Sequence, residues 1–234
     1  MADERGSWPG ADRRAPGRGE RSWSILEPLA RWLEAEGAAA AGLRVLDVGC
    51  GVKPYFPFFA TAREYVGVDV VETPYADLVG SVEQLPVEDG AFDVVLCIQV
   101  LEHVEEPARA IRELHRAVRP GGRVLLSTHG TQVYHPTPSD HWRWTHTGLE
   151  RLFRTNAPWR SVSVTPGAGT GACLGMLLAT YVHFAAKRAH AARAARPVNR
   201  AINRAAAALD ARVPSLREPL PGSLFANFHV VAER

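Results

Sequence analysis

Short apolar runs alternate with longer segments of mixed polarity along most of this chain. The runs are continuous, which is typical of strands that are buried on both faces of a sheet. In chain order they lie near 44–48, 64–69, 76–81, 92–98, 123–128, 161–166 and 225–232. Helical segments separate most of them. Strand and helix alternation with right-handed crossovers predicts a doubly wound α/β sheet.

Four helices are expected before and between these strands. Ser24 and Glu27 have the spacing of a capping box, which opens a helix that ends near Glu36. Pro54 and Pro107 suit the first turn of a helix, because a proline there loses no intrahelical hydrogen bond. The expected ranges are 24–36, 54–61, 107–118 and 147–156.

A glycine turn follows the first strand. Gly49 and Gly51 allow the backbone to take positive φ angles and to approach a ligand closely. Asp69 ends the second strand, where a carboxylate can accept two hydrogen bonds from a ribose diol. Pro54 stands where a dinucleotide fingerprint has its third glycine, which argues against pyrophosphate binding. The pattern predicts a nucleoside-containing cofactor at the carboxyl ends of parallel strands.

The run from Asp47 to Gly51, D-V-G-C-G, resembles motif I of the class I S-adenosylmethionine-dependent methyltransferases. The resemblance implies a Rossmann-like, seven-stranded and mostly parallel sheet whose last strand is antiparallel and inserted beside the sixth. It also implies S-adenosyl-L-methionine as cofactor and S-adenosyl-L-homocysteine as product. In that family the glycine loop passes under the methionine part, the second-strand acid holds the ribose, and a polar residue after the third strand contacts the adenine. The cofactor contacts expected on this basis are Asp47, Gly49, Cys50, Gly51, Asp69, Val70, Ser81, Val82, Glu83, Gln99 and His103.

Further motifs over about residues 40–160 look like the branch of the family that includes the ubiquinone- and menaquinone-pathway enzymes (methyltransferase type 11). They are Ser81 to Pro86, Gln99 to Val104 and Arg119 to Gly122. Ser81 stands where that branch usually has an aspartate. The segment from His129 to Thr145 is similar to the pattern H-G-x-x-x-Y-H-P-x-P-x-D-Y-W-R-W-T of a bacterial subgroup, with His141 where tyrosine is common.

This histidine-rich segment leaves the carboxyl end of the fifth strand, where open α/β sheets bind ligands. Methyl transfer depends chiefly on alignment, and a hydroxyl acceptor also benefits from a base near neutral pH. The base is expected at His135 first, His129 second and His103 third. Asp140 is expected to orient a histidine or to bind a substrate hydroxyl. The expected substrate contacts are Tyr134, His141, Trp142, Arg143 and Trp144.

Purely structural roles remain open for some of these residues. Trp142 and Trp144 also suit packing of the segment against the sheet, and Arg143 suits an ion pair with a nearby carboxylate. The histidine spacing matches neither H-E-x-x-H nor a tight Cys/His pattern, so no metal ion is expected.

A chain of 234 residues with 46% hydrophobic content suits one α/β unit, which predicts a single methyltransferase domain over 23–234. Residues 1–22 are rich in Gly, Pro and Arg and are expected to form a disordered tail.

A helical insertion is expected at about 170–215, before the last strand. Residues 167–186 contain no Asp, Glu, Lys or Arg, whereas 187–217 contain eight Lys or Arg and one acidic residue. The apolar part is short for a membrane span. A structural insertion is favoured, peripheral membrane contact through 172–217 comes second, and a span is least expected. Nucleic acid is not an expected partner, because no aromatic residues interleave with the charges.

Three scattered cysteines, Cys50, Cys97 and Cys173, form no disulfide framework, which favours a cytoplasmic location and leaves membrane association open. The predicted function is methyl transfer to a small-molecule or glycan acceptor, with a hydroxyl favoured. The alternatives are a nicotinamide-dependent oxidoreductase and a non-catalytic, membrane-associated protein of the same fold. The oligomeric state stays open.

Overall fold

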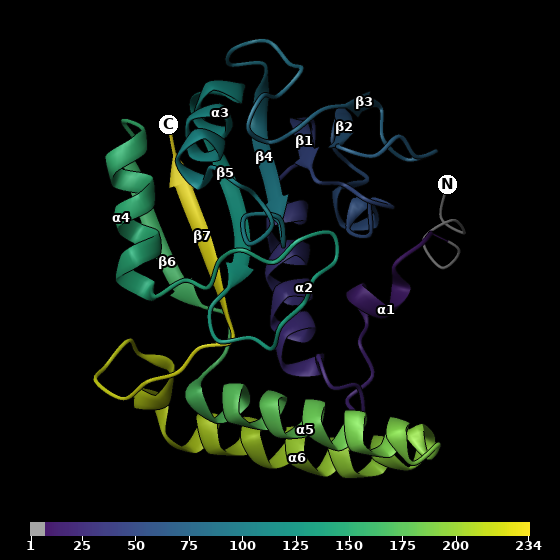
Figure 1. Cartoon of the computed structure of the whole chain (residues 1–234). Helices are drawn as coiled ribbons and strands as arrows, with labels where there is room; N and C mark the ends of the chain where they lie inside the picture. Colours follow the sequence, from purple (N-terminus) through teal and green to yellow (C-terminus); the bar gives the residue numbers. More distant parts are fainter. Residues whose placement is uncertain (1–7) are drawn as a thin grey trace.

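A computed structural model describes residues 8–234, which form a seven-stranded sheet with helices on both faces (Figure 1). The strand order is β3-β2-β1-β4-β5-β7-β6. β7 pairs antiparallel with both β5 and β6, and the other pairs are parallel. The predicted sheet, with its antiparallel last strand inserted beside the sixth, is confirmed. The strands are β1 Arg44–Val48, β2 Glu64–Asp69, β3 Leu78–Val79, β4 Phe92–Ile98, β5 Val118–His129, β6 Ser161–Pro166 and β7 Asn227–Glu233.

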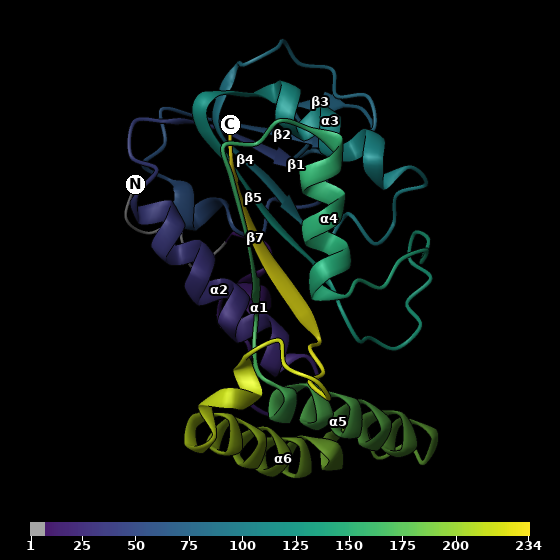
Figure 2. The same cartoon turned by 90° about the vertical axis from the view of Figure 1, so that its left-hand side faces the viewer.

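Helices lie on both faces of the sheet (Figure 2), and an apolar layer fills the space on each face. Helix α2 (Trp23–Ala38) and the 3₁₀ helix η2 (Phe56–Phe59) pack Leu29, Leu33 and Phe59 against one face. Helices α3 (Pro107–Ala117) and α4 (His146–Asn156) cover the other face. Burial of apolar area on both faces explains why the strand sequences are almost continuously apolar.

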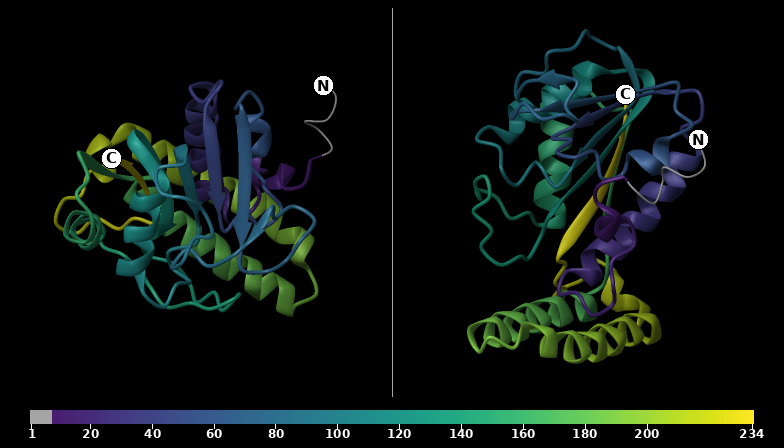
Figure 3. Two further views of the ribbon diagram at one scale, coloured as in Figure 1. Left: turned by 90° about the horizontal axis from the view of Figure 1, so that it is seen from above. Right: turned by 90° about the vertical axis from the view of Figure 1, so that its right-hand side faces the viewer.

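Helices α5 (Thr170–Arg188) and α6 (Ala192–Arg212) form a hairpin between β6 and β7, and the 3₁₀ helix η3 (Pro214–Arg217) follows it. The hairpin lies across the end of the molecule toward which β4 and β5 point (Figures 1 and 3). No helix within residues 8–234 combines the length and the apolar character that a membrane crossing requires.

Several elements differ from the sequence predictions. The helix expected at 54–61 is reduced to η2, because Pro57 has no N–H to give the carbonyl of Lys53 and so cannot close the first α-turn. Phe56 N donates to that carbonyl instead, at 3.1 Å. The capping box is also wrong: Ser24 lies inside α2, and its buried hydroxyl has no hydrogen-bond partner. β3 contains two residues rather than the six expected.

Residues 8–22, here named the N-terminal strap, contain the short helix α1 (Ala11–Arg14) and pack on the domain. Trp8 Nε1 donates to the carbonyl of Lys53 at 2.8 Å, and Arg14 Nη1 donates to the carbonyl of Pro54 at 2.5 Å. Further along, Asn203 Nδ2 on α6 donates to two strap carbonyls, at 2.9 and 3.0 Å. The expected disorder is therefore wrong for the strap, and residues 1–7 lie outside the described residues.

His229 on β7 is expected to make the fold sensitive to acid. Its ring stacks on Trp32 with centroids 4.5 Å apart, and burial lowers its pKa from 6.5 to about 4. Between these two pH values the unfolded chain binds a proton that the folded protein does not, so stability falls as the pH falls. We expect His229→Phe, which keeps a ring, to remove about 3 kcal/mol of the acid-induced loss in unfolding free energy. Denaturant unfolding of the wild type and of His229→Phe, at neutral pH and near pH 4, measures this change in unfolding free energy. His141→Phe, at an exposed site, is the control, and an equal effect there would contradict the assignment.

Candidate functional site

A pocket of about 810 Å³ opens at the carboxyl ends of β1, β2 and β4. It brings together all eleven residues expected to contact the cofactor, together with two of the three expected catalytic residues, His129 and His135. Asp140 and the five expected substrate contacts are not among the lining residues. The pocket-lining residues that had been expected are Asp47, Gly49, Cys50, Gly51, Asp69, Val70, Ser81, Val82, Glu83, Gln99, His103, His129 and His135.

The glycine turn needs its two glycines for different reasons. Gly49 has φ +68°, and a Cβ there would lie 2.3 Å from Cγ2 of Val100. Gly51 has φ +52°, and a Cβ there would meet nothing within 4 Å. The turn is fixed by the N–H groups of Gly49 and Cys50, which both donate to the carbonyl of Val68. Gly49 therefore allows the turn to pack closely against Val100, whereas the absence of a side chain at Gly51 leaves that part of the turn open to the pocket.

These two glycines give a matched pair of variants. Gly49→Ala combines backbone strain with a steric clash, so we expect it to lower the unfolding free energy by about 3 kcal/mol. Gly51→Ala carries backbone strain alone, and about 1 kcal/mol is expected. Denaturant unfolding compares the two. An equal loss in both variants would show that the contact with Val100 does not matter.

Asp69 lies at the end of β2 with its carboxylate beside the glycine turn. Gly51 N donates to Oδ2 at 2.8 Å, and Val71 N donates to Oδ1 at 3.0 Å. Each carboxylate oxygen can accept more than one hydrogen bond, so both keep capacity for a further donor. The backbone thus fixes the carboxylate in one orientation while leaving it able to bind a pair of hydroxyl groups.

Asp47 and Cys50 form the inner wall of the turn. Burial raises the pKa of Asp47 to about 7, although its Oδ2 accepts a hydrogen bond from the Tyr65 hydroxyl at 2.7 Å. Burial also raises the pKa of the Cys50 thiol to about 12, so this cysteine stays protonated. A protonated thiol is a poor nucleophile, which makes Cys50 a packing residue of the pocket wall rather than a reactive group.

The side of the pocket beyond β3 is ordered by local hydrogen bonds. Ser81 Oγ accepts from Glu83 N at 3.1 Å, and Glu83 Oε1 accepts from Glu106 N at 2.5 Å. Gln99, at φ +58°, donates its amide to Ser127 Oγ and Asn227 Oδ1, both at 3.0 Å. The amide nitrogen of Gln99, a pocket-lining residue, is thus hydrogen-bonded to side chains of β5 and β7.

Three histidines and one buried carboxylate form the opposite end of the pocket. Glu102 Oε1 lies 3.3 Å from Nε2 of His129 and 4.0 Å from Nε2 of His103. Its other oxygen accepts from Thr128 Oγ1 at 2.8 Å. The ring of His135 lies 5.9 Å from that of His103 and 6.4 Å from that of His129. The histidines from two strand ends and one loop therefore gather around Glu102.

Burial changes the proton affinities in this cluster. It raises the pKa of Glu102, which is fully buried, to about 7. Burial, with the positive charge of Arg143 and the neighbouring His103, lowers the pKa of His129 to about 3. The pKa of His135 is also lowered, first by desolvation and then by His103. Near neutral pH the histidines at 129 and 135 are therefore neutral, and Glu102 is close to half ionised.

The loop 130–145 holds its polar and aromatic residues differently from the prediction. Arg143 binds both carboxylate oxygens of Asp140, at 2.5 and 2.7 Å. The same carboxylate accepts from the backbone N–H of His135 at 2.7 Å. Asp140 therefore fixes the backbone of the loop, and its expected contact with a histidine or a substrate hydroxyl stays a prediction. Arg143 forms the ion pair with a nearby carboxylate that the sequence left open as its structural role, and the partner is Asp140.

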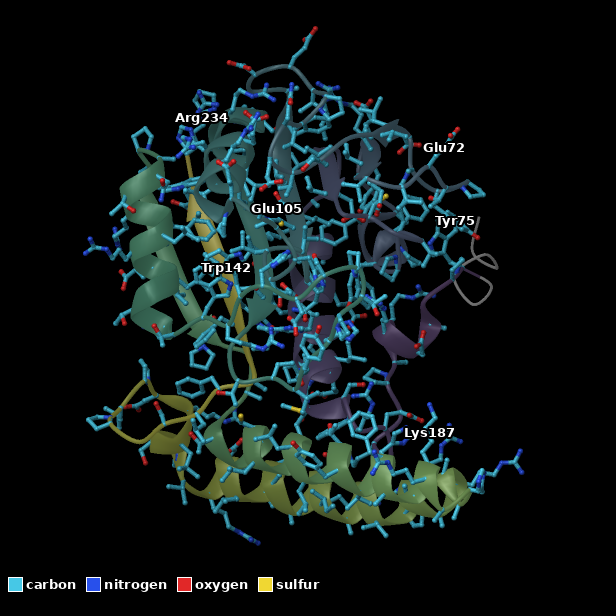
Figure 4. All side chains as sticks on the ribbon, in the orientation of Figure 1. Glu72, Tyr75, Glu105, Trp142, Lys187 and Arg234 are labelled. Atoms are coloured by element: carbon cyan, nitrogen blue, oxygen red, sulfur yellow. The ribbon has the colours of Figure 1, made fainter. Side chains whose placement is uncertain are left out.

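The two loop tryptophans pack rather than line the pocket. Trp142, labelled in Figure 4, donates from Nε1 to the carbonyl of Val104 at 2.8 Å. Its ring stacks on Trp144 with centroids 5.6 Å apart. Trp144 in turn packs against the core that α3 and α4 cover. Tyr134 is 78% exposed, and His141 is also exposed. These four side chains make no wall of the pocket as it stands.

A comparison with known families adds to this geometry. A family model described as a methyltransferase domain matches residues 20–157, more than half of the chain. The chain belongs to this methyltransferase domain family. A curated relative, the ubiquinone biosynthesis O-methyltransferase of Pseudomonas aeruginosa (strain LESB58), is 41% identical over 120 residues. That match covers 44% of this chain and 51% of the relative, so the chain spans about half the length of the curated relatives it matches.

Solved structures agree with the methyltransferase-domain fold. A S-adenosylmethionine-dependent methyltransferase from Mesorhizobium loti has a TM-score of 0.51 at 17% identity, covering 88% of this chain and 98% of that chain. The cyclase SpnF has a TM-score of 0.53 at 20% identity, covering 89% and 80%. At such identities the likeness shows the fold alone, and a protein described as a cyclase among these neighbours illustrates that the fold does not fix the reaction.

Sequence reasoning missed part of the pocket of this methyltransferase domain. Glu102 was not singled out, although an acidic residue beside His103 after an apolar strand is a signal that could have found it. The strap had no such signal, because its composition suggested disorder. Its residues and the start of α2 nevertheless line the pocket with Asp12, Arg13, Ser22 and Leu26. Among residues 8–234 no group of three or more His, Cys, Asp or Glu has the arrangement of a metal site.

Proposed function

We propose that this methyltransferase domain transfers a methyl group from S-adenosylmethionine to a hydroxyl of a small molecule. The observation that carries the proposal is the Asp69 carboxylate, fixed by Gly51 N and Val71 N at the mouth of the glycine turn. Family membership supports the reaction class, and the O-methyltransferase activity named for the P. aeruginosa relative supports oxygen as the acceptor atom.

The residues present fit this cofactor. Both Asp69 oxygens can accept from a ribose diol, and the open side of Gly51 leaves room for the methionine part. Asp47 would meet the methionine end, and Ser81 to Glu83 would meet the adenine edge. When bound, S-adenosylmethionine supplies an electrophilic methyl group on a sulfonium. The pocket volume of about 810 Å³ leaves space for an acceptor beside the cofactor.

His129 backed by Glu102 is the proposed base for the acceptor hydroxyl. Burial lowers the pKa of His129 to about 3, so its imidazole alone is a weak base. The proposal therefore depends on the ionised Glu102 carboxylate, 3.3 Å from Nε2, to stabilise the imidazolium that forms when His129 takes the hydroxyl proton. Burial of both groups strengthens this coupling relative to water. His135, on the exposed loop, is proposed to close over the acceptor. This order differs from the sequence prediction, which ranked His135 first, because only the structure pairs His129 with a carboxylate.

The nicotinamide-dependent alternative has less support. Pro54 occupies the position of the third glycine, which departs from the dinucleotide fingerprint. The carbonyl of Pro54 also accepts a hydrogen bond from Arg14 of the strap. A glycan acceptor stays within the proposal as one class of hydroxyl substrate.

Turnover against a panel of acceptors tests the proposal. The purified chain is incubated with S-adenosylmethionine and with phenols, catechols and sugars, together with amine analogues of the same size. Formation of S-adenosylhomocysteine is followed by mass spectrometry. We expect product with a hydroxyl acceptor and none with the matched amine. Methylation of the amine alone would contradict the assignment of oxygen as the acceptor atom.

A further inference from the structure

The α5–α6 hairpin exposes a row of large apolar side chains. Leu174, Leu178 and Tyr181 recur at helical spacing on α5 and are 51%, 54% and 65% exposed. Phe184 extends the row to a surface hollow of about 690 Å³ that Lys187 and Arg188 also line. The opposite side of α5 is used for packing, since Met176 belongs to a buried cluster that includes Ile25 of α2.

Helix α6 continues this apolar face. A Cβ on Gly175 would lie 2.7 Å from Cβ of Ala206 and 3.6 Å from Cγ2 of Ile202, so these two residues of α6 face α5. Val198 and Leu209 lie at helical spacing from Ile202 and Ala206 and are 47% and 46% exposed. Apolar groups on both helices thus border the seam between them, where each would add contact area to any surface laid against the hairpin.

The charge of the hairpin has one sign. Asp210 is the single acidic residue in 170–217, and it is buried, accepting from Gly171 N at 2.8 Å and Ala172 N at 3.0 Å. Its charge is therefore used to cap α5 and is withheld from the surface. The basic residues of the same stretch are all exposed: Lys187, Arg188, Arg193, Arg196, Arg200, Arg204, Arg212 and Arg217.

The hairpin also has a suitable position. Both helices lie across the end of the molecule as a separate layer, crossing the direction of β4 and β5 (Figures 1 and 2). Lys187 stands at the far end of α5, near the strap (Figure 4). Helices that lie in the plane of a membrane interface have this combination of an exposed apolar face, basic flanks and a flat placement.

We propose that the hairpin docks this apolar face onto an anionic lipid surface. The exposed leucines and Tyr181 would enter the interfacial region, while the long Arg and Lys side chains keep their charges at the headgroups. Charge selects this occupant over a second copy of the chain, because two such hairpins would bring like charges together. The carboxyl ends of β4 and β5 would then face the lipid side of the molecule.

Vesicle flotation of the full chain tests the docking, with vesicles of phosphatidylcholine alone or mixed with phosphatidylglycerol. The wild type is expected to float only with the anionic vesicles. Leu178→Gln/Tyr181→Gln should lower the partition coefficient about tenfold or more by removing apolar contact. Arg200→Gln/Arg204→Gln should lower it by removing charge, and salt should have a weaker effect on this variant. Arg63→Gln/Arg151→Gln removes two exposed cations elsewhere and is the matched control.

Four results would overturn the docking. One is a wild type that stays in solution with both vesicle types, and another is hairpin variants that float as the wild type does. The third is a dimer in light scattering that Leu178→Gln/Tyr181→Gln dissociates, which would assign the face to a second copy. The fourth is a single-stranded RNA that binds the hairpin as tightly as the anionic vesicles do and displaces them, which would assign the face to nucleic acid. Cofactor binding, measured on the same samples, is independent of every one of these outcomes.

Discussion

Asp69→Asn is expected to weaken the binding of S-adenosylhomocysteine about a hundredfold, or about 3 kcal/mol, with the fold intact. In the proposed complex the carboxylate would make charge-assisted hydrogen bonds to the two ribose hydroxyls, and an amide oxygen would replace only part of them. The neutral side chain keeps an acceptor for Gly51 N or Val71 N, so the glycine turn should stay ordered. Isothermal titration calorimetry measures the change.

Glu72→Gln supplies the control for Asp69→Asn. Glu72 is exposed, lies three residues after Asp69 and does not line the pocket, so its loss removes the same charge from the same region. Its affinity should match that of the wild type. An equal loss of affinity in both variants would mean that the effect of Asp69 comes from its long-range negative charge and not from a contact with the ribose.

His129→Gln is expected to lower kcat by about a hundredfold to a thousandfold and to leave the affinity for S-adenosylhomocysteine nearly unchanged. The glutamine cannot take the acceptor proton, whereas alignment of the acceptor is retained, so some turnover should survive. Single-turnover kinetics at saturating cofactor separate this loss from binding. His135→Gln is the comparison, and its expected loss is smaller, mainly in KM for the acceptor. The reverse order of losses would move the base to His135.

The pH dependence gives an independent check on the same pair. Burial raises the pKa of Glu102 to about 7, so this carboxyl is protonated below that pH and ionised above it. The imidazolium on His129 is stabilised only by the ionised form, and kcat should therefore rise through about pH 7. Glu102→Gln should remove this rise and lower the plateau. A variant that keeps the wild-type profile would show that another group titrates.

The fold could be predicted from sequence where local pattern decides the structure. The mainly apolar runs at 44–48 and 92–98, with Arg44, Asp47 and Asp93 as their polar residues, placed β1 and β4 to the residue. Strands that are buried on both faces show no regular polar alternation. The spacing from Gly51 to Asp69 likewise identified two sides of one pocket, since parallel strands bring their carboxyl ends to one edge.

What sequence could not supply was contact between segments that are distant along the chain. Glu102 follows β4 and His129 is the last residue of β5, so their pairing depends on the register of β4 with β5. The strap has a disordered composition, yet Trp8 and Arg14 find carbonyl acceptors near residue 54. Proximity to histidines in sequence likewise does not reveal that Arg143 binds both oxygens of Asp140. The expected role of Asp140 toward a histidine or a substrate hydroxyl stays a prediction.

Calorimetric titration of the wild-type protein with S-adenosylmethionine, S-adenosylhomocysteine and NADH tests the central claim most directly. The pocket built on Asp69 and the glycine turn predicts binding of both sulfur compounds at about micromolar affinity and no heat from NADH. Binding of NADH by a well-folded protein that ignores both sulfur compounds would contradict the assignment of this site to methyl transfer.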